Sequence, residues 1–519
     1  MYVLKENQWF CKTQAHLTEE DTVCLRGVTL TWRDLSVYAM DRGRKSTCKQ
    51  LINNVKGAAK PGDLTAIIGA SGAGKSSLMA ALAFRTGPEL LIHGDIRANG
   101  TPVDSSYMMH NSGYMHQEDI FVATMTVIEH LWFMARMKLD GRVQVLDIRR
   151  KIDGLLRDVG LTSRRDVRIG SSDTDDKVLS GGEKKRLSFA TELLTDPKIL
   201  FLDEPTTGQD SHSANCLISQ LKSFAAKGRT VLCTIHQPSS TIFSWFDRII
   251  LIAEGRVAFA GGIDQAVEFF ASQGYECPRK YNPADFLIAI VATGSKNENG
   301  EEIAHEICDV FSTSKAYNEI DRILETQMQS MHSVNVSDHL FPCLFSPCNN
   351  KTRSNDLFVL SLQSRSELLS DDRFITRKEA RYCSRLYWLI YRHFLQVLRD
   401  PSVQIIRILQ KVSVATIAGL CFVGAVNFDQ LGIQATQGVI FILVSENAFF
   451  PMYATLALIP QELPLLRREY RAGMYPVYLY YAARILSLAS KESLAIASHS
   501  LILKGNYLKT KCMNSRYLV

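Results

Sequence analysis

Apolar runs that end abruptly in polar residues predict the strands of a parallel sheet. Residues 199–202 are all apolar and are followed at once by Asp203 and Glu204, and a second apolar run leads to His236. Strands buried on both faces read in this way, and open α/β sheets bind their ligands at the carboxyl ends of such strands. The carboxylate pair is therefore expected at a ligand site, and the ligand is expected to be phosphorylated.

Earlier in the chain, the same kind of pattern predicts more sheet and a set of helices. Residues 28–32 read as a strand that residues 34–38 continue, and residues 64–68 read as another strand. Helices are expected across residues 124–160, where four apolar side chains recur at helical spacing: Val127, Leu131, Met134 and Met137. Such a stripe is more typical of a core face than of a cofactor site, so an inserted helical subdomain is predicted.

The loop after the strand at 64–68 matches the phosphate-binding pattern G-x-x-x-x-G-K-[ST]. Its backbone N–H groups would cradle phosphate at the start of a helix. Lys75 is predicted to neutralise the β- and γ-phosphates, and the Ser76 hydroxyl to ligate Mg²⁺. The predicted ATP-binding residues here are Gly69, Ala70, Ser71, Gly72, Ala73, Gly74, Lys75, Ser76 and Ser77. An accidental glycine-rich turn is the alternative, and the flanking strand and helix argue against it.

The catalytic predictions concern residues at strand ends. Asp203 is expected to hold Mg²⁺ directly or through water, and Glu204 to polarise the attacking water. Gln117 follows another β-like run, and its amide is predicted to reach the metal or that water, although a loop glutamine is usually only solvated. His236 is expected to hydrogen-bond the γ-phosphate, with a structural histidine as the alternative.

Two further features are candidates for nucleotide contacts. Tyr38 and Trp32 lie shortly before the glycine-rich loop, where an aromatic ring can stack on adenine, and core packing is an equally good reading. A second tip, Ser180, Gly181, Gly182 and Glu183, begins a predicted helix and offers N–H groups and a hydroxyl to phosphate. Its separation from Lys75 is too large for one site to be assumed, so its phosphate can belong to a partner chain.

Taken in order, these motifs resemble the nucleotide-binding domain of an ATP-binding cassette (ABC) transporter. The matching segments are residues 69–76 (Walker A), Gln117 (Q-loop), residues 179–183 (signature), residues 199–204 (Walker B), residues 208–210 with Asp210 (D-loop) and His236 (switch histidine). A signature together with both Walker motifs is very specific. The resemblance implies an α/β P-loop NTPase with a helical subdomain, followed by an incomplete all-α transmembrane domain.

Finer features resemble the G subfamily, whose members are half-transporters with the nucleotide domain ahead of the membrane domain. They are Glu183 in place of the more usual Gln, Ile169 with Gly170, residues 235–240 and residues 281–286. Residues 30–35, 52–54 and 81–85 are most similar to the white/scarlet/brown group of eye-pigment transporters, nearest the scarlet type. The resemblance covers residues 27–295 strongly and 384–486 moderately.

The resemblance also implies a mechanism in which two cassettes enclose two ATP molecules. Each ATP lies between the Walker A motif of one chain and the signature of the other, so Ser180, Gly181 and Gly182 act in trans. Closure drives the membrane halves from inward-facing to outward-facing, and hydrolysis resets them. Gln209 departs from the Leu that is usual in the D-loop, whereas the metal and base positions match the family.

Composition narrows the picture only slightly. The chain has 519 residues, of which 46% are hydrophobic and 22% charged, and its net charge is +6. This charge is weak support for a nucleic-acid partner, because a cytoplasmic surface facing anionic lipid explains it as well. Cysteines scattered without a C-x-x-C pair indicate reduced thiols in a cytosolic body. No apolar core occurs in the first thirty residues, so no secretory signal is predicted.

Six segments are expected along the chain. They are a flexible leader (1–25), a nucleotide-binding domain (26–295), a linker (296–380), an amphipathic connecting helix (381–401), a partial transmembrane domain (402–490) and an atypical tail (491–519). The connecting helix is basic and carries Trp and Tyr, which suits the cytoplasmic membrane interface.

Two membrane spans are predicted, at about 403–426 and 433–459. Neither Lys nor Arg occurs between Lys411 and Arg467, so both flanks of the pair are expected on the cytoplasmic side. Glu446 falls within the second span, where substrate binding and helix packing are equally good readings. The family's half-transporter has six spans, so a truncated form, a gene-model artefact or a fragment is favoured over a complete translocation domain.

The leading functional hypothesis is a membrane half-transporter subunit that couples ATP hydrolysis to transport of a small organic molecule. By resemblance, it forms a homodimer or pairs with a white-like subunit and moves pigment precursors into granules. Lipid or sterol export, and residence in the plasma membrane, are the alternatives. A soluble ABC ATPase acting on nucleic acid is disfavoured by the interfacial helix and the hydrophobic hairpin, and a non-transporting dimer partner is a third hypothesis.

Overall fold

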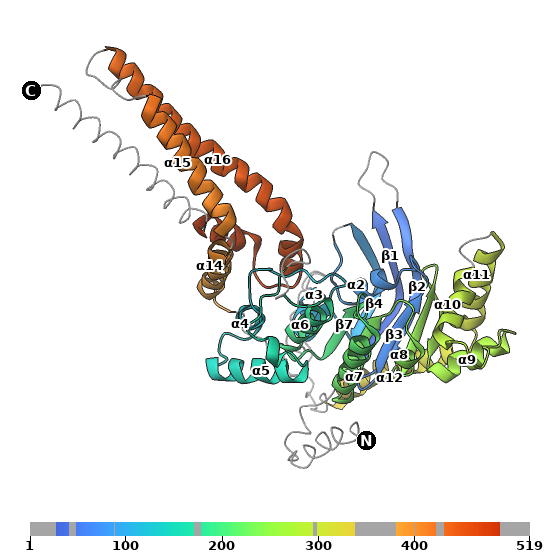
Figure 1. The fold of residues 1–519 in the computed structure, drawn as a ribbon. Coiled ribbons are helices and arrows are strands. Elements are labelled where there is room, and N and C mark those ends of the chain that lie inside the picture. The colour runs from blue at the N-terminus through green and yellow to red at the C-terminus, as the bar shows by residue number, and fades with distance from the viewer. Residues whose placement is uncertain are drawn as a thin grey trace, which may run out of the picture. The chain divides into compact units, whose positions relative to one another are not determined.

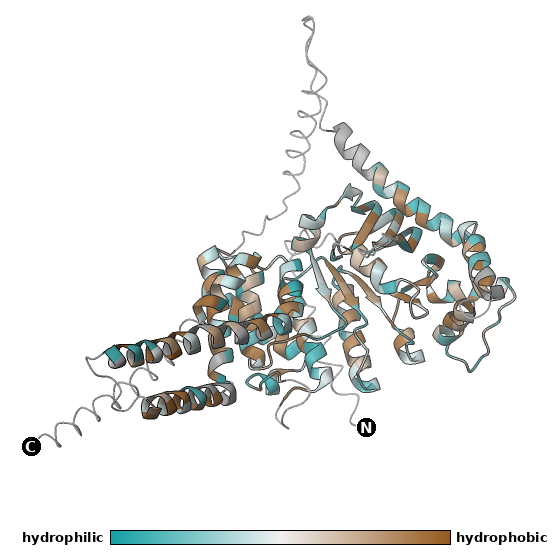
Figure 2. Cartoon of the chain, turned by 90° about the horizontal axis from the view of Figure 1, so that it is seen from above, coloured by the Kyte–Doolittle hydropathy of each residue, from teal (hydrophilic) through white to brown (hydrophobic). Residues whose placement is uncertain are grey.

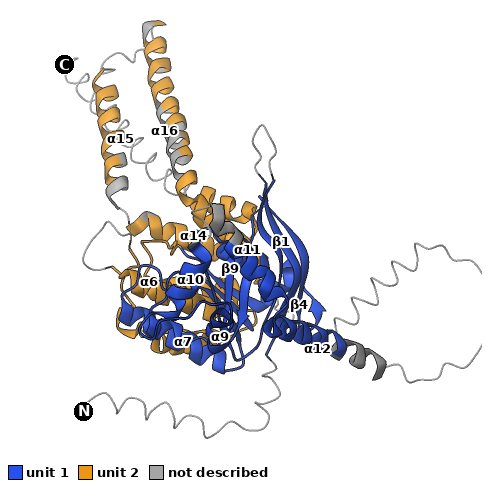
Figure 3. Ribbon diagram, turned by 90° about the vertical axis from the view of Figure 1, so that its right-hand side faces the viewer, with its two compact units in different colours: residues 1–117, 195–378 blue, residues 118–194, 379–519 orange. Residues whose placement is uncertain are grey.

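The chain divides into two units that interleave along the sequence (Figure 3). Unit 1 comprises residues 1–117 and 195–378, and unit 2 comprises residues 118–194 and 379–519. The computed structural model describes residues 27–40, 48–87, 89–170, 178–293, 298–337, 380–399, 401–421 and 430–487. The predicted leader and tail, and the loop between the two predicted spans, lie outside these residues.

In the described part of unit 1, the central sheet has the strand order β10-β9-β3-β8-β7-β6 (Figure 1). The strands are β3 (Leu64–Gly69), β6 (Ser112–Met115), β7 (Ile199–Asp203), β8 (Thr230–Thr234), β9 (Arg248–Ala253) and β10 (Arg256–Gly261). Neighbours from β9 to β6 pair in parallel, and β10 pairs antiparallel with β9. Every residue of β3, β7 and β8 is buried, and apolar residues predominate in them. In Figure 2, which is coloured by hydropathy, the strands show much brown, the colour of hydrophobic residues. The predicted parallel sheet is confirmed.

A second sheet in unit 1 is antiparallel, with the order β2-β1-β4-β5. Its strands are β1 (Leu30–Met40), β2 (Cys48–Ala59), β4 (Leu90–Ala98) and β5 (Thr101–Pro102). The strand predicted at 28–38 is therefore confirmed as β1, although it belongs to this antiparallel sheet and not to the central sheet. Trp32 is only 1% exposed, because its ring packs where Gly57 lacks a side chain.

Helices of unit 1 connect the strands and cover the central sheet. They are α2 (Lys75–Leu82), α3 (Ser105–Asn111), α7 (Ser211–Ala226), α8 (Ser240–Phe243), α9 (Ile263–Ser272) and α10 (Pro283–Thr293). Helix α2 contacts β7 and β8, and α7 contacts β3 and β8. The helix predicted after the glycine-rich loop is thus confirmed.

Two helices occupy the first half of the segment predicted as a linker. They are α11 (Glu298–Ser312), which packs on β10, and α12 (Lys315–Ser337), which packs on β2. Phe311 and Leu324 are buried, and Lys56 of β2 binds Asp321 at 2.5 Å and lies over the Tyr317 ring at 3.2 Å. Helices α11 and α12 therefore pack on the sheets of unit 1, and their buried apolar residues, where described, recur at helical spacing.

The first segment of unit 2 is helical, as predicted for residues 124–160. It contains α4 (Val127–Lys138), α5 (Val145–Asp158), the short 3₁₀-helix η1 (Thr162–Arg164) and α6 (Gly181–Leu193). The predicted core stripe of Val127, Leu131, Met134 and Met137 is at most 3% exposed. That prediction is confirmed.

The second segment of unit 2 contains three longer helices: α14 (Tyr382–Arg399), α15 (Pro401–Cys421) and α16 (Gln430–Arg471). Helix α14 confirms the predicted connecting helix as an element and packs on α4. Helices α15 and α16 cover most of the two predicted spans. Within the described residues, however, no helix combines the length and the apolar character needed to cross a membrane, so the spans are not confirmed.

Candidate functional site

The carboxyl ends of four neighbouring parallel strands bring the predicted catalytic segments of unit 1 together. Strand β3 leads into the glycine-rich loop, β7 ends at Asp203, and β8 lies between them. In the register of β7 and β8, Asp203 lies opposite Thr234. Strand β6 pairs with β7 and leads to Gln117. The sheet edge predicted as a ligand site therefore exists.

Backbone conformation explains the glycines of the phosphate-binding loop. Gly74 has φ of +102° and is the N-cap of α2, and a Cβ there would lie 2.6 Å from Ile52 Cδ1. A Cβ on Gly69 would lie 2.3 Å from the Ile252 carbonyl oxygen. Only glycine fits such positions without strain. The loop thus presents backbone N–H groups at the start of α2, as an anion-binding loop requires.

The ammonium of Lys75 lies across this loop. Its Nζ donates to the carbonyl oxygens of Gly69 at 3.0 Å and Ala70 at 2.8 Å. Burial lowers the pKa of Lys75, while the carboxylates of Glu204 and Asp203 act in the opposite direction. The Lys75 Nζ therefore lies in the loop, within reach of any phosphate bound there.

A chain of hydrogen bonds joins the glycine-rich loop to the two carboxylates. Ser76 Oγ and Thr234 Oγ1 both donate to Asp203 Oδ1, at 2.8 and 2.7 Å. The Glu204 N–H donates in turn to Thr234 Oγ1 at 2.9 Å. These contacts bring Ser76, Asp203 and Glu204 into one cluster, as the sequence predicted.

The side chain of Glu204 is held by two further donors. Gln117 Nε2 donates to Glu204 Oε2 at 2.7 Å, and Thr207 Oγ1 donates to the same oxygen at 3.1 Å. Gln117 therefore lies beside the predicted general base, where an amide can orient a water. The backbone of Glu204 has φ of +46°, in the left-handed region. This conformation is uncommon for a residue with a side chain and is often found at functional sites.

These residues fit a magnesium ion that arrives with a nucleotide. The Ser76 hydroxyl and the Asp203 carboxylate offer oxygen atoms 2.8 Å apart, and Mg²⁺ prefers oxygen ligands. Among the described residues, no cluster of three or more His, Cys, Asp or Glu can hold a metal alone. In nucleotide sites, Mg²⁺ is commonly held by one or two carboxylates together with substrate phosphates.

Other predicted contacts have mixed outcomes. His236 is exposed and lies two residues beyond β8, next to the strand that ends in the carboxylates. Trp32 is a core residue, so its candidacy for adenine stacking is wrong. Tyr38 is partly exposed on β1, where its ring meets His93 edge-on. The roles predicted for His236 and Tyr38 stay predictions.

The signature tip lies in unit 2, as the cap of α6. Ser180 Oγ accepts from the Glu183 N–H at 3.3 Å, and Glu183 Oε2 accepts from the Ser180 N–H at 2.9 Å. This reciprocal capping box needs Glu or Gln at the third position. Arg164 also donates to Glu183 at 2.9 Å, and these bonds lower the pKa of Glu183 despite its partial burial. Ser180 and Gly181 remain exposed at the helix N-terminus.

The D-loop residues have local structural partners. Asp210 is the N-cap of α7, where it accepts from the Ser213 N–H at 3.0 Å. Gln209, which replaces the Leu usual in the family, donates from Nε2 to the Pro205 carbonyl at 2.9 Å. Its buried Oε1 has no partner among the described residues.

Sequence reasoning missed three residues of the cluster. Thr234 and Thr207 donate hydroxyl groups to the carboxylates, and Tyr114 of β6 packs beside Asp203. Burial, together with the Asp203 carboxylate, raises the pKa of the Tyr114 phenol, which therefore stays neutral. Thr234 was within reach of prediction, since aligning the two parallel strands by their apolar runs places it opposite Asp203.

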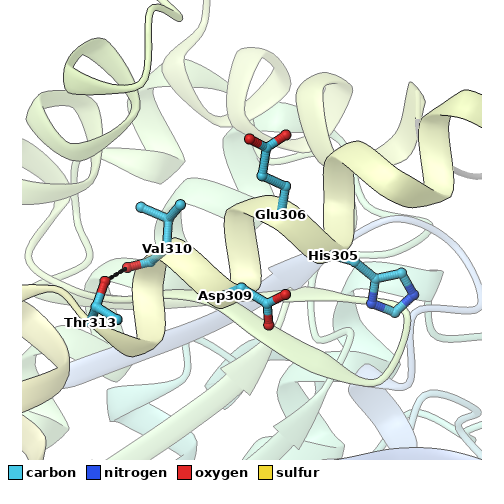
Figure 4. A pocket seen from close by; sticks show the side chains of 5 residues that line it. All are labelled: His305, Glu306, Asp309, Val310 and Thr313. Carbon is cyan, nitrogen blue, oxygen red and sulfur yellow. Dashed lines mark hydrogen bonds between the residues drawn. The ribbon is translucent and has the colours of Figure 1, made fainter.

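A separate hollow lies on α11, at the β10 edge of unit 1 (Figure 4). It is lined by His305, Glu306, Asp309, Val310 and Thr313. Asp309 binds Arg256 at 2.5 Å, and Thr313 donates to the Val310 carbonyl at 2.9 Å. Strands β9, β3 and β8 separate this edge of the sheet from β7. The hollow is therefore not part of the phosphate-binding edge.

Comparison with known families places both parts of the chain. Residues 52–207 match the family model described as ABC transporter, and residues 384–503 match the one described as ABC-2 type transporter. The nucleotide-binding fold expected from the motifs is thus supported by a family model as well as by the strand order.

Three relatives illustrate the similarity. Protein scarlet of Drosophila melanogaster is 45% identical over 464 residues, which are 89% of this chain and 65% of that protein. Protein white of Ceratitis capitata is 33% identical over 93% of this chain and 69% of its own length. The broad substrate specificity ATP-binding cassette transporter ABCG2 of Rattus norvegicus is 32% identical over 91% and 68%. The chain spans about two thirds of the length of these curated relatives.

Proposed function

Because this chain belongs to the ABCG family of ABC half-transporters, we propose that it binds and hydrolyses ATP to drive transport of a small organic molecule across a membrane. The observation that carries this proposal is the cluster of Ser76, Asp203, Glu204 and Gln117 at one sheet edge. These side chains, close together beside the glycine-rich loop, support a site for phosphate, metal and the attacking water.

The roles follow from the contacts. Lys75 and the loop N–H groups bind the phosphates, and Ser76 and Asp203 hold Mg²⁺, with Gln117 as a further ligand. When bound, the ion neutralises charge on the phosphate oxygens. Glu204 takes a proton from the attacking water, which Gln117 orients. His236 hydrogen-bonds the γ-phosphate, and Tyr38 stacks on adenine.

The site is completed by a second half-transporter. Ser180 and Gly181 are exposed at the N-terminus of α6, where N–H groups favour an anion. Ser180 Oγ accepts the hydrogen bond from the Glu183 N–H, and this bond does not use the hydroxyl hydrogen, which can point at a phosphate. The partner is a second copy of this chain or a white-like subunit. The tip at Ser180 contacts the ATP that is bound by this partner.

The membrane role is supported by the exposed surface of α15 and α16. Large apolar side chains are exposed there, namely Ile405, Ile406, Leu409, Ile417, Leu420, Ile433, Ile440, Phe441, Val444, Phe449, Met452 and Leu456. Water-exposed surfaces rarely gather so many, whereas lipid would cover them. The nucleotide domain is cytosolic in this arrangement.

The proposed cargo is an eye-pigment precursor delivered to granules or vesicles. Support comes from the 45% identity to protein scarlet and the resemblance to protein white. Uptake of labelled tryptophan-derived precursors into vesicles that contain this chain and a white-like subunit tests the cargo. ATP-dependent uptake of labelled sterol instead would redirect the proposal to lipid export.

A substitution of the general base tests the ATPase. Glu204→Gln keeps shape and hydrogen bonding but cannot accept a proton, so turnover should fall about 100-fold while ATP still binds. The readouts are phosphate release and binding of a fluorescent ATP analogue by the full chain. Glu268→Gln, at an exposed position of α9, is the matched control. Undiminished hydrolysis by Glu204→Gln would remove Glu204 from this role.

A further inference from the structure

We propose that Thr234 positions both carboxylates of the hydrolytic site, an inference that rests on the proposed ATPase function. Thr234 is fully buried at the carboxyl end of β8. Its hydroxyl donates to Asp203 Oδ1 at 2.7 Å and accepts the N–H of Glu204 at 2.9 Å. One side chain thus connects the metal-binding residue to the backbone of the base.

The two bonds fix each other. A threonine hydroxyl carries a single hydrogen, and here that hydrogen is committed to Asp203. The oxygen lone pairs must then point away from Asp203, and the Glu204 N–H meets one of them. Rotating the side chain about Cα–Cβ would move the hydroxyl oxygen away from both partners, so the rotamer that makes one bond also makes the other, and Asp203 and Glu204 keep a fixed relation.

The backbone of Glu204 needs such a restraint. Its φ of +46° is unfavourable for a residue with a Cβ, and such conformations persist only where surrounding contacts hold them. The bond to Thr234 anchors the N–H of this residue. The carboxylate is thereby directed to Gln117 and Thr207, both of which donate to Oε2.

Thr234 positions Asp203 in a way that Ser76 does not duplicate. Both hydroxyls donate to Asp203 Oδ1, but Ser76 is itself a proposed metal ligand. The bond from Thr234 is therefore the one that does not depend on the metal. Thr234 acts through Asp203 and Glu204 and touches neither phosphate nor water in this role.

Removing the hydroxyl at nearly constant shape tests the inference. In the full chain purified from membranes, Thr234→Val should lower kcat for ATP by about 10- to 100-fold, while KM changes less than about threefold, since a misplaced base slows the chemical step without weakening phosphate binding. Thr234→Ser keeps the hydroxyl and should recover most of kcat. Binding of a fluorescent ATP analogue by Thr234→Val verifies that the variant is folded.

Thr230→Val is the matched control. Thr230 is also fully buried and begins the same strand, but its hydroxyl donates to the Val28 carbonyl at the opposite end of β8. It should keep the wild-type kcat. An unchanged kcat in Thr234→Val overturns the positioning role and leaves the ATPase intact. An equal loss in both Val variants, or a loss that Ser does not rescue, also overturns it. A wild-type chain that hydrolyses no ATP overturns the proposed function and, with it, this inference.

Discussion

Two neighbouring carboxylates of unit 1 and a buried carboxylate of unit 2 have opposite kinds of hydrogen-bond partner. In unit 1, Asp203 and Glu204 accept hydrogen bonds from neutral hydroxyl and amide groups. In unit 2, Glu469 of α16 is buried against Arg392 of α14, whose NH1 lies 2.6 and 2.9 Å from the two carboxylate oxygens. Tyr475 also donates to Glu469.

A second ion pair in unit 2 repeats this arrangement. Arg399, at the end of α14, donates two bonds to Glu129 of α4, at 2.6 and 2.7 Å. It also donates to the Thr124 carbonyl at 2.9 Å. Glu129 is in addition the capping-box partner of Thr126. The connecting helix is thus joined to α4 by an ion pair at its C-terminal end, and to α16 by the buried pair of Arg392 and Glu469.

The kind of partner distinguishes carboxylates that can bind a ligand from carboxylates that join helices. Neutral donors orient a carboxylate and leave its negative charge available to a cation, whereas a guanidinium neutralises it. A buried ion pair adds little net stability, but breaking one by removing a single partner is costly. Asp203 and Glu204 therefore keep their charge available to a ligand, whereas the pairs Arg392–Glu469 and Arg399–Glu129 join helices of unit 2.

The largest effect is expected from breaking the buried pair. Arg392→Met leaves the Glu469 carboxylate buried without its cation, which should cost about 3 to 5 kcal/mol of unfolding free energy. Thermal unfolding and limited proteolysis of the full chain measure it. Replacing both residues by Met should restore much of the loss, while Arg381→Met, at an exposed position ahead of α14, should be neutral. Equal instability of the single and double variants would show that charge is not the cause.

A pH-dependent loss of stability should mark unit 2. Burial, with Arg468 and Arg392 nearby, lowers the pKa of His130 to about 3. The unfolded chain takes up a proton near pH 6.5, whereas the folded chain does not, so stability present above pH 6.5 is lost as the pH falls toward 3. About 2 kcal/mol should disappear between pH 7.5 and 5. Unfolding midpoints of His130→Phe should change less over this range, and an identical pH dependence would refute the assignment.

The smallest effect is expected at a helix cap. Thr126→Ala removes the side-chain acceptor at the start of α4 and should cost about 1 kcal/mol. Faster hydrogen exchange in the first turn of α4 reports it. Asp104→Ala, which removes the corresponding acceptor for Tyr107 in α3 of unit 1, provides the comparison. Since Glu129 also binds Arg399, only the change in unit 2 should loosen α14 as well. If hydrogen exchange in α14 does not change in Thr126→Ala, the helix cap and the Glu129–Arg399 ion pair act independently.

Local sequence predicted well which residues meet at the carboxyl edge of the central sheet. A glycine-rich loop and an apolar run ending in carboxylates are each contained in a few consecutive residues, and parallel pairing brings them to one edge. The core stripe of α4 was predicted equally well, because Val127, Leu131, Met134 and Met137 recur at the helical period. Thr234 was missed because a threonine in an apolar strand is ordinary until its neighbour across the sheet is known.

Contacts between distant segments were beyond such reading. Arg392 and Glu469 are 77 positions apart, and nothing in either helix alone indicates that the two charges pair. Polar composition also led the segment at 298–337 to be predicted as linker, although α11 and α12 bury a few large side chains each. In both cases the contact depends on which distant segments pack together, and the local sequence pattern does not show this.

The bond between Lys56 and Asp321 has a consequence for synthesis of the chain. It joins residues 265 positions apart, and α12 covers a face of the β1–β2 hairpin. At roughly 5 to 20 residues per second, a ribosome needs roughly 10 to 50 s to add the intervening stretch. During that interval this face of the hairpin is not covered by α12, so the nascent polypeptide offers a natural target for chaperones until α12 emerges.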